Sequence, residues 1–198
     1  MANYNAIKYD GFSKGTFTLI KTLTASSSAT LSFVNGSSDV VLDSTYKEYL
    51  FIYNNLHPAT DGASLEFNLS IDSGSNYNVT KTSSSYRAFQ DEAGTATSIA
   101  YFAANDLAQG TGFQPLGDEN QSNDNDHGQC GILHLFNPSD TTFVKHFLGI
   151  NVNVHNGDYI INDYIGGYAN TTSAVDAIQF KYHTGNIDAG TIQLFGVA

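Results

Sequence analysis

The chain of 198 residues contains no tryptophan, one cysteine and three prolines. Because a disulfide needs two cysteines, Cys130 cannot form one within the chain, and we interpret it as a small buried residue. The absence of tryptophan counts against a sugar-processing cleft, since such clefts commonly rely on broad aromatic platforms. The segment that opens the sequence is polar, which predicts that no signal peptide is present.

Basic residues are also scarce. The chain has eight Lys and Arg residues and 19 Asp and Glu residues, which gives a formal net charge of −11. Binding to nucleic acid or to an anionic membrane requires clustered cations, so both are excluded as expected partners. Hydrophobic residues make up 41% of the chain, enough for one domain with its own core.

Motifs for catalysis are missing as well. The chain has no Gly-x-Ser-x-Gly nucleophile motif, and its six histidines lack the spacing of a zinc-binding helix. Sequence alone does not identify a facing pair of glycosidase carboxylates. We therefore predict a protein that is not an enzyme, with no catalytic residue, no cofactor and no metal.

One acidic run raises the question of calcium. Asp124 and Asp126 stand at alternate positions before Gly128, with Asp118 and Glu119 close by in sequence. Calcium prefers such oxygen-rich loops, but the EF-hand spacing is not met. We favour a solvated acidic loop and leave a calcium site open.

The chain is rich in alternating patterns. Leu65, Phe67, Leu69 and Ile71 alternate with polar residues, a period of two that predicts a strand with one dry face and one wet face. The pattern recurs throughout. Strands are expected near 16–24, 29–33, 49–53, 64–72, 130–137, 147–154, 159–161, 178–182 and 191–197, with weaker ones at 76–81, 85–90 and 97–103. The predicted fold class is all-β, a single antiparallel, jelly-roll-like β-sandwich.

Three connections stand out. Asn156-Gly157 is the strongest hairpin turn in the chain. The strands at 49–53 and 64–72 are expected to form a second hairpin through the turn signal Asp61-Gly62. The segment 104–128 is long for a loop in a compact domain, so it should bind something or cover something.

The beginning of the sequence has a different character. Residues 1–22 carry a net charge of +2, and residues 1–15 show no clear periodicity. We expect 1–15 to be a flexible N-terminal arm and 16–198 to be the sandwich domain. The alternatives for the arm are a solvated terminus and a docking segment. In the second case the residues that bind the partner would be Tyr4, Lys8, Tyr9 and Lys14.

Several segments together carry a family resemblance. They are Leu23–Phe33, Ser44–Tyr53, Leu133–Pro138, Asn170–Phe180 and the closing Gly185–Gly196. This layout resembles small β-sandwich virion proteins of tailed bacteriophages, especially marine ones. In those proteins a "Tyr-Lys" strand follows the first turn, and a Gly-x-Ile-x-Leu-aromatic-Gly strand closes the domain. The resemblance covers about residues 20–197 and includes no catalytic signature.

The resemblance implies a non-enzymatic virion structural protein, made in the bacterial host cytoplasm: a capsid decoration protein, or a head-fibre, tail-fibre or adaptor component. Its partners would be other virion proteins of the capsid or tail. A homo-oligomer, possibly a trimer, is also implied, and the 25 Phe and Tyr residues favour it. Rings at Tyr86, Phe89, Tyr101 and Phe102 are candidates for exposed contacts. The alternative function is a carbohydrate-binding module for host recognition, with its site on loops such as 104–128.

Overall fold

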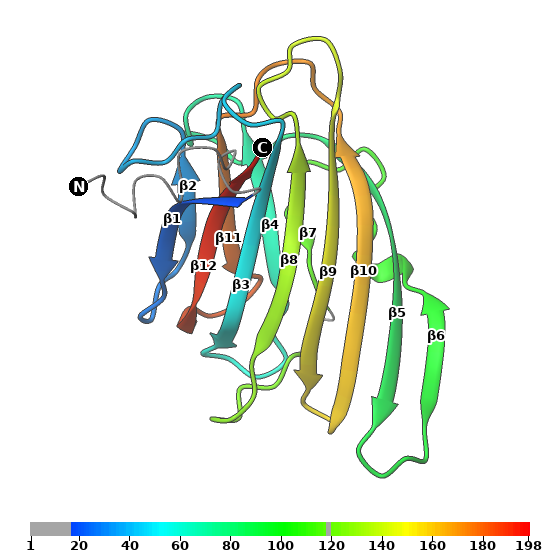
Figure 1. Cartoon of the computed structure of the whole chain (residues 1–198). Helices are drawn as coiled ribbons and strands as arrows, with labels where there is room; N and C mark the ends of the chain where they lie inside the picture. Colours follow the sequence, from blue (N-terminus) through cyan, green and yellow to red (C-terminus); the bar gives the residue numbers. More distant parts are fainter. Residues whose placement is uncertain (1–16, 118–119) are drawn as a thin grey trace, which may run out of the picture.

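A computed structural model describes residues 17–117 and 120–198, and its strands form two antiparallel sheets that pack face to face (Figure 1). The prediction of an all-β sandwich is confirmed. The large sheet has eight strands in the order β1 (Phe17–Thr24), β12 (Ile187–Val197), β3 (Glu48–Pro58), β8 (Gln129–Phe136), β9 (Lys145–His155), β10 (Tyr159–Ala169), β5 (Lys81–Asp91) and β6 (Thr97–Tyr101). The small sheet has four, in the order β2 (Leu31–Val34), β11 (Ala177–Tyr182), β4 (Leu65–Ser70) and β7 (Gln114–Pro115).

Eight of these strands form a jelly roll. Strand β1 pairs with β12, β2 with β11, β3 with β8, and β4 with β7, so the chain resembles one long hairpin wound around a core. The result is two sheets of four strands, β1-β12-β3-β8 and β2-β11-β4-β7. This is the double-sheet arrangement of jelly rolls.

The other four strands are insertions into the jelly-roll topology. Strands β5 and β6 lie between β4 and β7 in sequence, and β9 and β10 lie between β8 and β11. The two inserted hairpins pair with each other through β10 and β5 and with the jelly roll through β8 and β9. They extend the large sheet past the small one, and we call β9, β10, β5 and β6 the wing.

Aromatic rings fill the space between the sheets. Phe51 of β3 lies 5.4 Å from Phe33 of β2 and 5.5 Å from Phe180 of β11, measured between ring centroids. Phe67 of β4 makes an edge contact with Phe147 of β9 at 5.3 Å. All five side chains are buried and form the centre of the core.

Two local predictions are wrong. Strands β3 and β4 do not form a hairpin, because β3 belongs to the large sheet and β4 to the small one. The turn at Asp61-Gly62 instead carries the chain across the core, with Gly62 at a φ of +72°. Residues 76–80 are not a strand, and β5 begins at Lys81.

The hairpin at Asn156-Gly157 is confirmed. Strands β9 and β10 pair along their full length, from His155 opposite Tyr159 to Lys145 opposite Ala169. The single helix in the described part of the chain is the 3-10 turn η1 (Ala103–Asn105). No described helix has the length and hydrophobicity to cross a bilayer.

Candidate functional site

The wing turns its polar side chains inward. On β9, Lys145, Asn151 and Asn153 are buried, whereas Leu148 and Ile150 are exposed on the opposite face. Asp163 of the neighbouring β10 also points inward and is buried. At these positions the usual order of a half-buried strand, in which the apolar set faces the interior, is reversed, although Phe147 of β9 and Ile161 and Ile165 of β10 are also buried on the inner face.

The segment 103–122 explains how polar groups can face inward there. Its backbone bonds to β5, where Lys81 and Gly110 exchange two hydrogen bonds of 2.8 and 3.0 Å. Farther along, Ser122 N–H donates to the carbonyl of Val154 at 2.9 Å. The segment also buries its own polar residues, Asn105, Gln114 and Gln121. The described parts of the long loop, 103–117 and 120–122, therefore cover part of the inner face of the wing.

Buried lysines belong to this polar layer. The Lys81 ammonium donates to the amide oxygen of Asn68 and to the carbonyl of Val79. Burial lowers the pKa of Lys81 to about 7. Burial also lowers the pKa of Lys145, whose ammonium donates to three backbone carbonyls, those of Asp140, Phe143 and Thr171. Both lysines are fully buried, so we assign them a structural role rather than a role in chemistry on a substrate.

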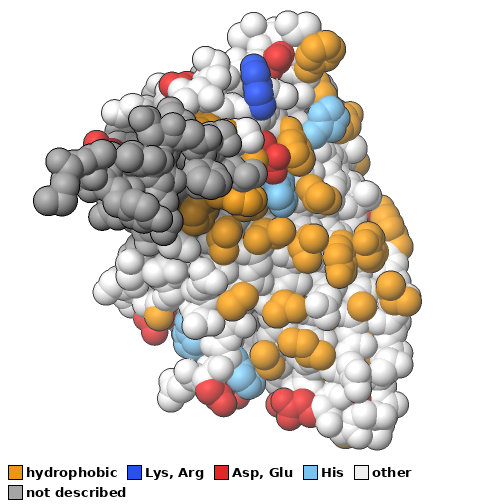
Figure 2. Space-filling model, viewed as in Figure 1, with side chains coloured by type: hydrophobic (Ala, Val, Ile, Leu, Met, Phe, Trp, Pro, Cys, Tyr) orange, Lys and Arg blue, Asp and Glu red, His pale blue; other side chains and the backbone are white. Residues whose placement is uncertain are grey.

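The outer face of the large sheet is apolar. In the antiparallel register Ile132 of β8 lies opposite Ile150, Ile150 opposite Tyr164, Tyr164 opposite Tyr86, and Tyr86 opposite Tyr101. These five residues form one row across five strands, which we call the apolar row. Residues of neighbouring rows enlarge the patch: Leu148, Val152, Ile160 and Ile99. Figure 2 shows hydrophobic side chains spread over this face.

Charge is missing from the same surface. Strands β8, β9, β10, β5 and β6 are fully described, and none of their outward positions carries Lys, Arg, Asp or Glu. Carboxylates border this face on both sides: Glu48 of β3 is hydrogen-bonded to Nδ1 of His134, and Asp106 accepts a hydrogen bond from the hydroxyl of Tyr101. Exposed apolar patches without charge are typical of contact surfaces between proteins.

A hollow interrupts the patch where the sheet lacks a side chain. Gly166 lies between Leu148 and Ser84 in register, and the hollow above it has a volume of about 360 Å³. Its wall is formed by Tyr164 and Tyr86, whose rings stack 4.8 Å apart and within 5° of parallel. Because each ring gives one face to the other, the pair does not form an open platform of the kind on which a sugar stacks.

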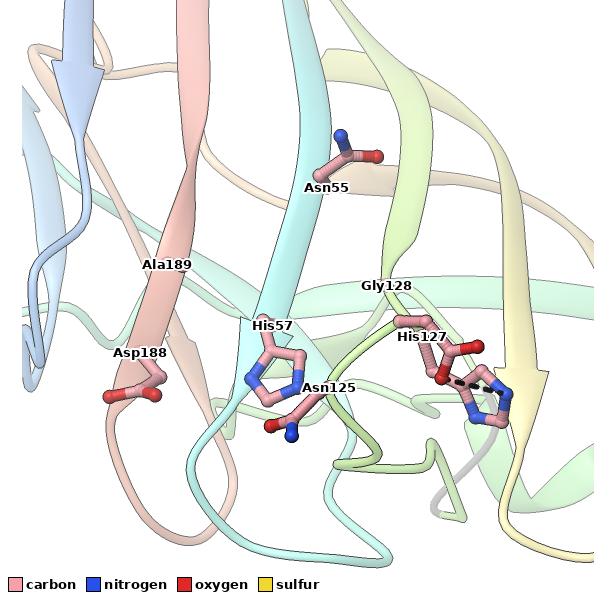
Figure 3. Close-up of a pocket in the computed structure, with 8 residues that line it drawn as sticks. Asn55, His57, Asn125, His127, Gly128, Asp188 and Ala189 are labelled. Atoms are coloured by element: carbon pink, nitrogen blue, oxygen red, sulfur yellow. Dashed lines mark ion pairs between the residues drawn. The ribbon is translucent and has the colours of Figure 1, made fainter.

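A second, polar cleft lies at one end of the sandwich, with a volume of about 370 Å³ (Figure 3). Irregular pairing creates it, since β12 shifts register against β3 between Ile187 and Thr191. Gly190 has a φ of +104°, and a Cβ there would lie 2.4 Å from the carbonyl oxygen of Asn55. Bulges of this kind at a sheet rim often stand next to binding sites. The lining residues are Asn55, His57, Asn125, Asp126, His127, Gly128, Asp188 and Ala189.

Two histidines stand on this cleft. The Nε2 atom of His57 lies 3.1 Å from the carbonyl oxygen of Asp124. His127 has Asp124 on one side, at 4.0 Å from Nδ1, and Asp126 on the other, at 3.8 Å from Nε2. Figure 3 shows Asp188 and His57 on neighbouring strands with Asn125 below them. The cleft therefore offers donors and acceptors for a polar ligand.

The same loop was the candidate for calcium. Asp124 and Asp126 lie on two sides of the His127 ring rather than around a common point. Within residues 17–117 and 120–198, no group of three or more His, Cys, Asp or Glu side chains fits a metal ion. Asp118 and Glu119 lie outside the described residues.

The predicted contact residues divide into three groups. Tyr4, Lys8, Tyr9 and Lys14 lie outside the described residues. Tyr86 and Tyr101 are exposed on the outer face, as expected. Phe89 and Phe102 are not outward contacts: Phe89 lies opposite the buried Ile161, and the Arg87 guanidinium sits 3.9 Å above the ring of Phe102. The sequence analysis did not identify Ile150 and its neighbours as a surface. It singled out the loop 104–128, which supplies Asn125, Asp126, His127 and Gly128 to the end cleft, but not Asn55, His57 or Asp188.

Comparisons with protein-family models, with curated proteins and with solved structures found no match in any of the three.

Proposed function

We propose that this chain is a non-enzymatic structural protein of a bacteriophage virion, a capsid decoration protein or a head-fibre, tail-fibre or adaptor component. The observation that carries the proposal is the uncharged apolar outer face of the wing and β8. A large exposed apolar face supports a role in protein contact, and the polar layer beneath it is too deeply buried to meet a substrate. The virion setting comes from the family resemblance of the sequence.

The test is to locate the protein in purified particles of the phage that encodes it. Cryo-electron microscopy should show the sandwich on the capsid or tail, with the apolar row against a neighbouring protein. A phage that carries Ile150→Asp should produce particles with reduced occupancy of the protein. Absence of the protein from washed particles would overturn the proposal.

The N-terminal arm is a second element of the same proposal. We propose that residues 1–15 help attach the domain, through Lys8 and Lys14 to carboxylates and through Tyr4 and Tyr9 to apolar surface. Removing 1–15 should leave the circular dichroism of the sandwich unchanged and lower incorporation into particles. Normal incorporation of the shortened chain would exclude this role.

A carbohydrate-binding module is the second candidate, and the end cleft favours it. Its lining of Asn, Asp and His side chains suits hydroxyl groups, although no Tyr or Phe ring lines it. A glycan array with the wild-type protein and with Asp188→Ala would decide. Binding that is lost in the variant would favour this function, whereas an array without signal would reject it.

A further inference from the structure

We infer that the apolar row is covered by the same row of a second copy of this chain, in a twofold, face-to-face dimer. The inference rests on the proposed function of this face as a protein contact surface and identifies its first partner. The resemblance implied a trimer, but a patch that meets the same patch of a second copy closes as a pair. In such an isologous contact the same residues serve both subunits.

Charge is the first argument for a second copy. The chain carries −11, so two copies repel each other through most orientations. The outward positions of β8 and the wing are the least repulsive surface, because none of them is charged and the carboxylates bonded to them, Glu48 at His134 and Asp106 at Tyr101, lie at the two edges of the face. A basic partner would gain no electrostatic attraction from this face. A second acidic copy that docks there, in contrast, avoids the repulsion between the two negatively charged chains.

Area is the second argument. With five strands about 4.8 Å apart and four rows about 6.8 Å apart, the flat footprint is roughly 24 by 27 Å, or about 650 Å². Stable interfaces bury about 800 Å² of accessible surface on each partner, and side chains that stand above the sheet add to the flat value. The face therefore has the size that one stable dimer contact requires.

Shape is the third argument. The hollow above Gly166 is a recess, while Ile99 and Tyr101 on the edge strand β6 project, with 73% and 65% of their surface exposed. A surface that carries both a recess and a projection can complement itself across a twofold axis. Two sheets that pack face to face stand about 10 Å apart, which leaves room for one interdigitated layer of side chains.

The experiment measures mass and surface protection on the full chain. Sedimentation equilibrium should give twice the chain mass of 21.3 kDa at high micromolar concentration. Ile150→Asp places a charge within the row and should weaken dimerisation by about a hundredfold or more. Phe143→Asp is the matched control, because Phe143 is 69% exposed but lies in the β8–β9 connection, off the strands of this face. It should remain a dimer.

A second variant tests the recess without adding a charge. A Cβ at Gly166 would meet its nearest neighbour, Leu148, only at 3.9 Å, so Gly166→Val should fold normally. By filling the recess it should weaken the dimer about tenfold or more. Circular dichroism of both variants establishes that they are folded.

Cys130 reports which face is covered. It is the single cysteine of the chain and lies opposite Val152, beside the apolar row. Its reaction with a maleimide should be slower in the wild-type dimer than in Ile150→Asp. A wild-type monomer, a trimer, or a dimer that survives Ile150→Asp would overturn the inference. If the protein is a monomer in solution and another virion protein covers the apolar row, the dimer inference fails and the proposed function is retained. If the protein is a dimer but is absent from particles, the proposed function fails and the dimer inference is retained.

Discussion

Strands β3 and β9 belong to the same sheet, yet β3 turns aromatic side chains toward the interior, whereas β9, apart from Phe147, turns Lys and Asn side chains there. Strand β3 points Tyr49, Phe51 and Tyr53 inward against the small sheet. Strand β9 points Asn151 and Asn153 inward, where the segment 103–122 provides the cover. The comparison shows that the layer packed against a strand determines which of its two faces is dry. Four predictions test this contrast.

The largest effect is expected in the jelly-roll half. Phe180→Ala removes a ring that contacts Phe33, Phe51 and Phe67, and it should lower the free energy of unfolding by about 3–5 kcal/mol. Urea denaturation measures this. The control Phe143→Ala, at an exposed ring, should change the value by about 0.5 kcal/mol or less. Equal effects at the two sites would contradict the assigned core.

The polar layer of the wing should make the free energy of unfolding depend on pH. Unfolded Lys81 holds its proton up to its ordinary pKa of 10.5, while burial lowers the folded pKa to about 7. Between these two values the unfolded state binds more protons, so stability rises with pH, by roughly 2–4 kcal/mol from pH 7 to pH 10. The variant Lys81→Met should show a smaller rise, because the lowered pKa of Lys145 acts in the same direction. Parallel pH profiles of the two proteins would show that Lys81 is not desolvated.

A pair of glycines probes the two faces of the sheet. A Cβ at Gly131 would lie 2.6 Å from the carbonyl oxygen of Ile150 and 2.7 Å from the ring of Tyr53, whereas one at Gly166 meets nothing closer than 3.9 Å. Gly131→Ala should therefore cost about 2 kcal/mol, and Gly166→Ala close to zero. Thermal unfolding compares them. A neutral Gly131→Ala would mean that the inner face is loosely packed.

The smallest effect belongs to the outer face. Ile150→Thr should change the stability of the monomer by about 0.5 kcal/mol or less, because Ile150 is exposed. In the wild type, the melting temperature should rise with protein concentration if the row is buried by association. Unfolding of a dilution series measures both effects, and a large loss in the dilute variant would place Ile150 in the core.

Several features of this contrast could be predicted from the sequence. The alternation of β9 was evident, and the Asn156-Gly157 turn identified its hairpin with β10. The inward face could not be predicted, because it depends on the segment 103–122, which is distant in sequence. Turn residues also do not determine whether the chain returns to the same sheet or crosses to the other one. This is why β3 and β4 were expected to pair.

The strand period of two could have predicted which of the four candidate rings are exposed on the same face. Tyr86 and Phe89 are three positions apart on one strand, so a period of two already places them on opposite faces. Tyr101 and Phe102 are adjacent and differ for the same reason. The end cleft had no such signal, because Asn55, Asp126 and Asp188 come from three distant segments that meet only when β12 is in place.

The long wound hairpin also sets the order in which this protein can form. Strand β1 has a single partner, β12, and these two lie at opposite ends of the described chain. Until β12 leaves the ribosome, β3 has no neighbour on one side and the aromatic core stays open. The inserted hairpin β9–β10 is local and can form earlier, but contacts between distant segments make folding slow. We therefore expect the wing to assemble before the jelly roll closes.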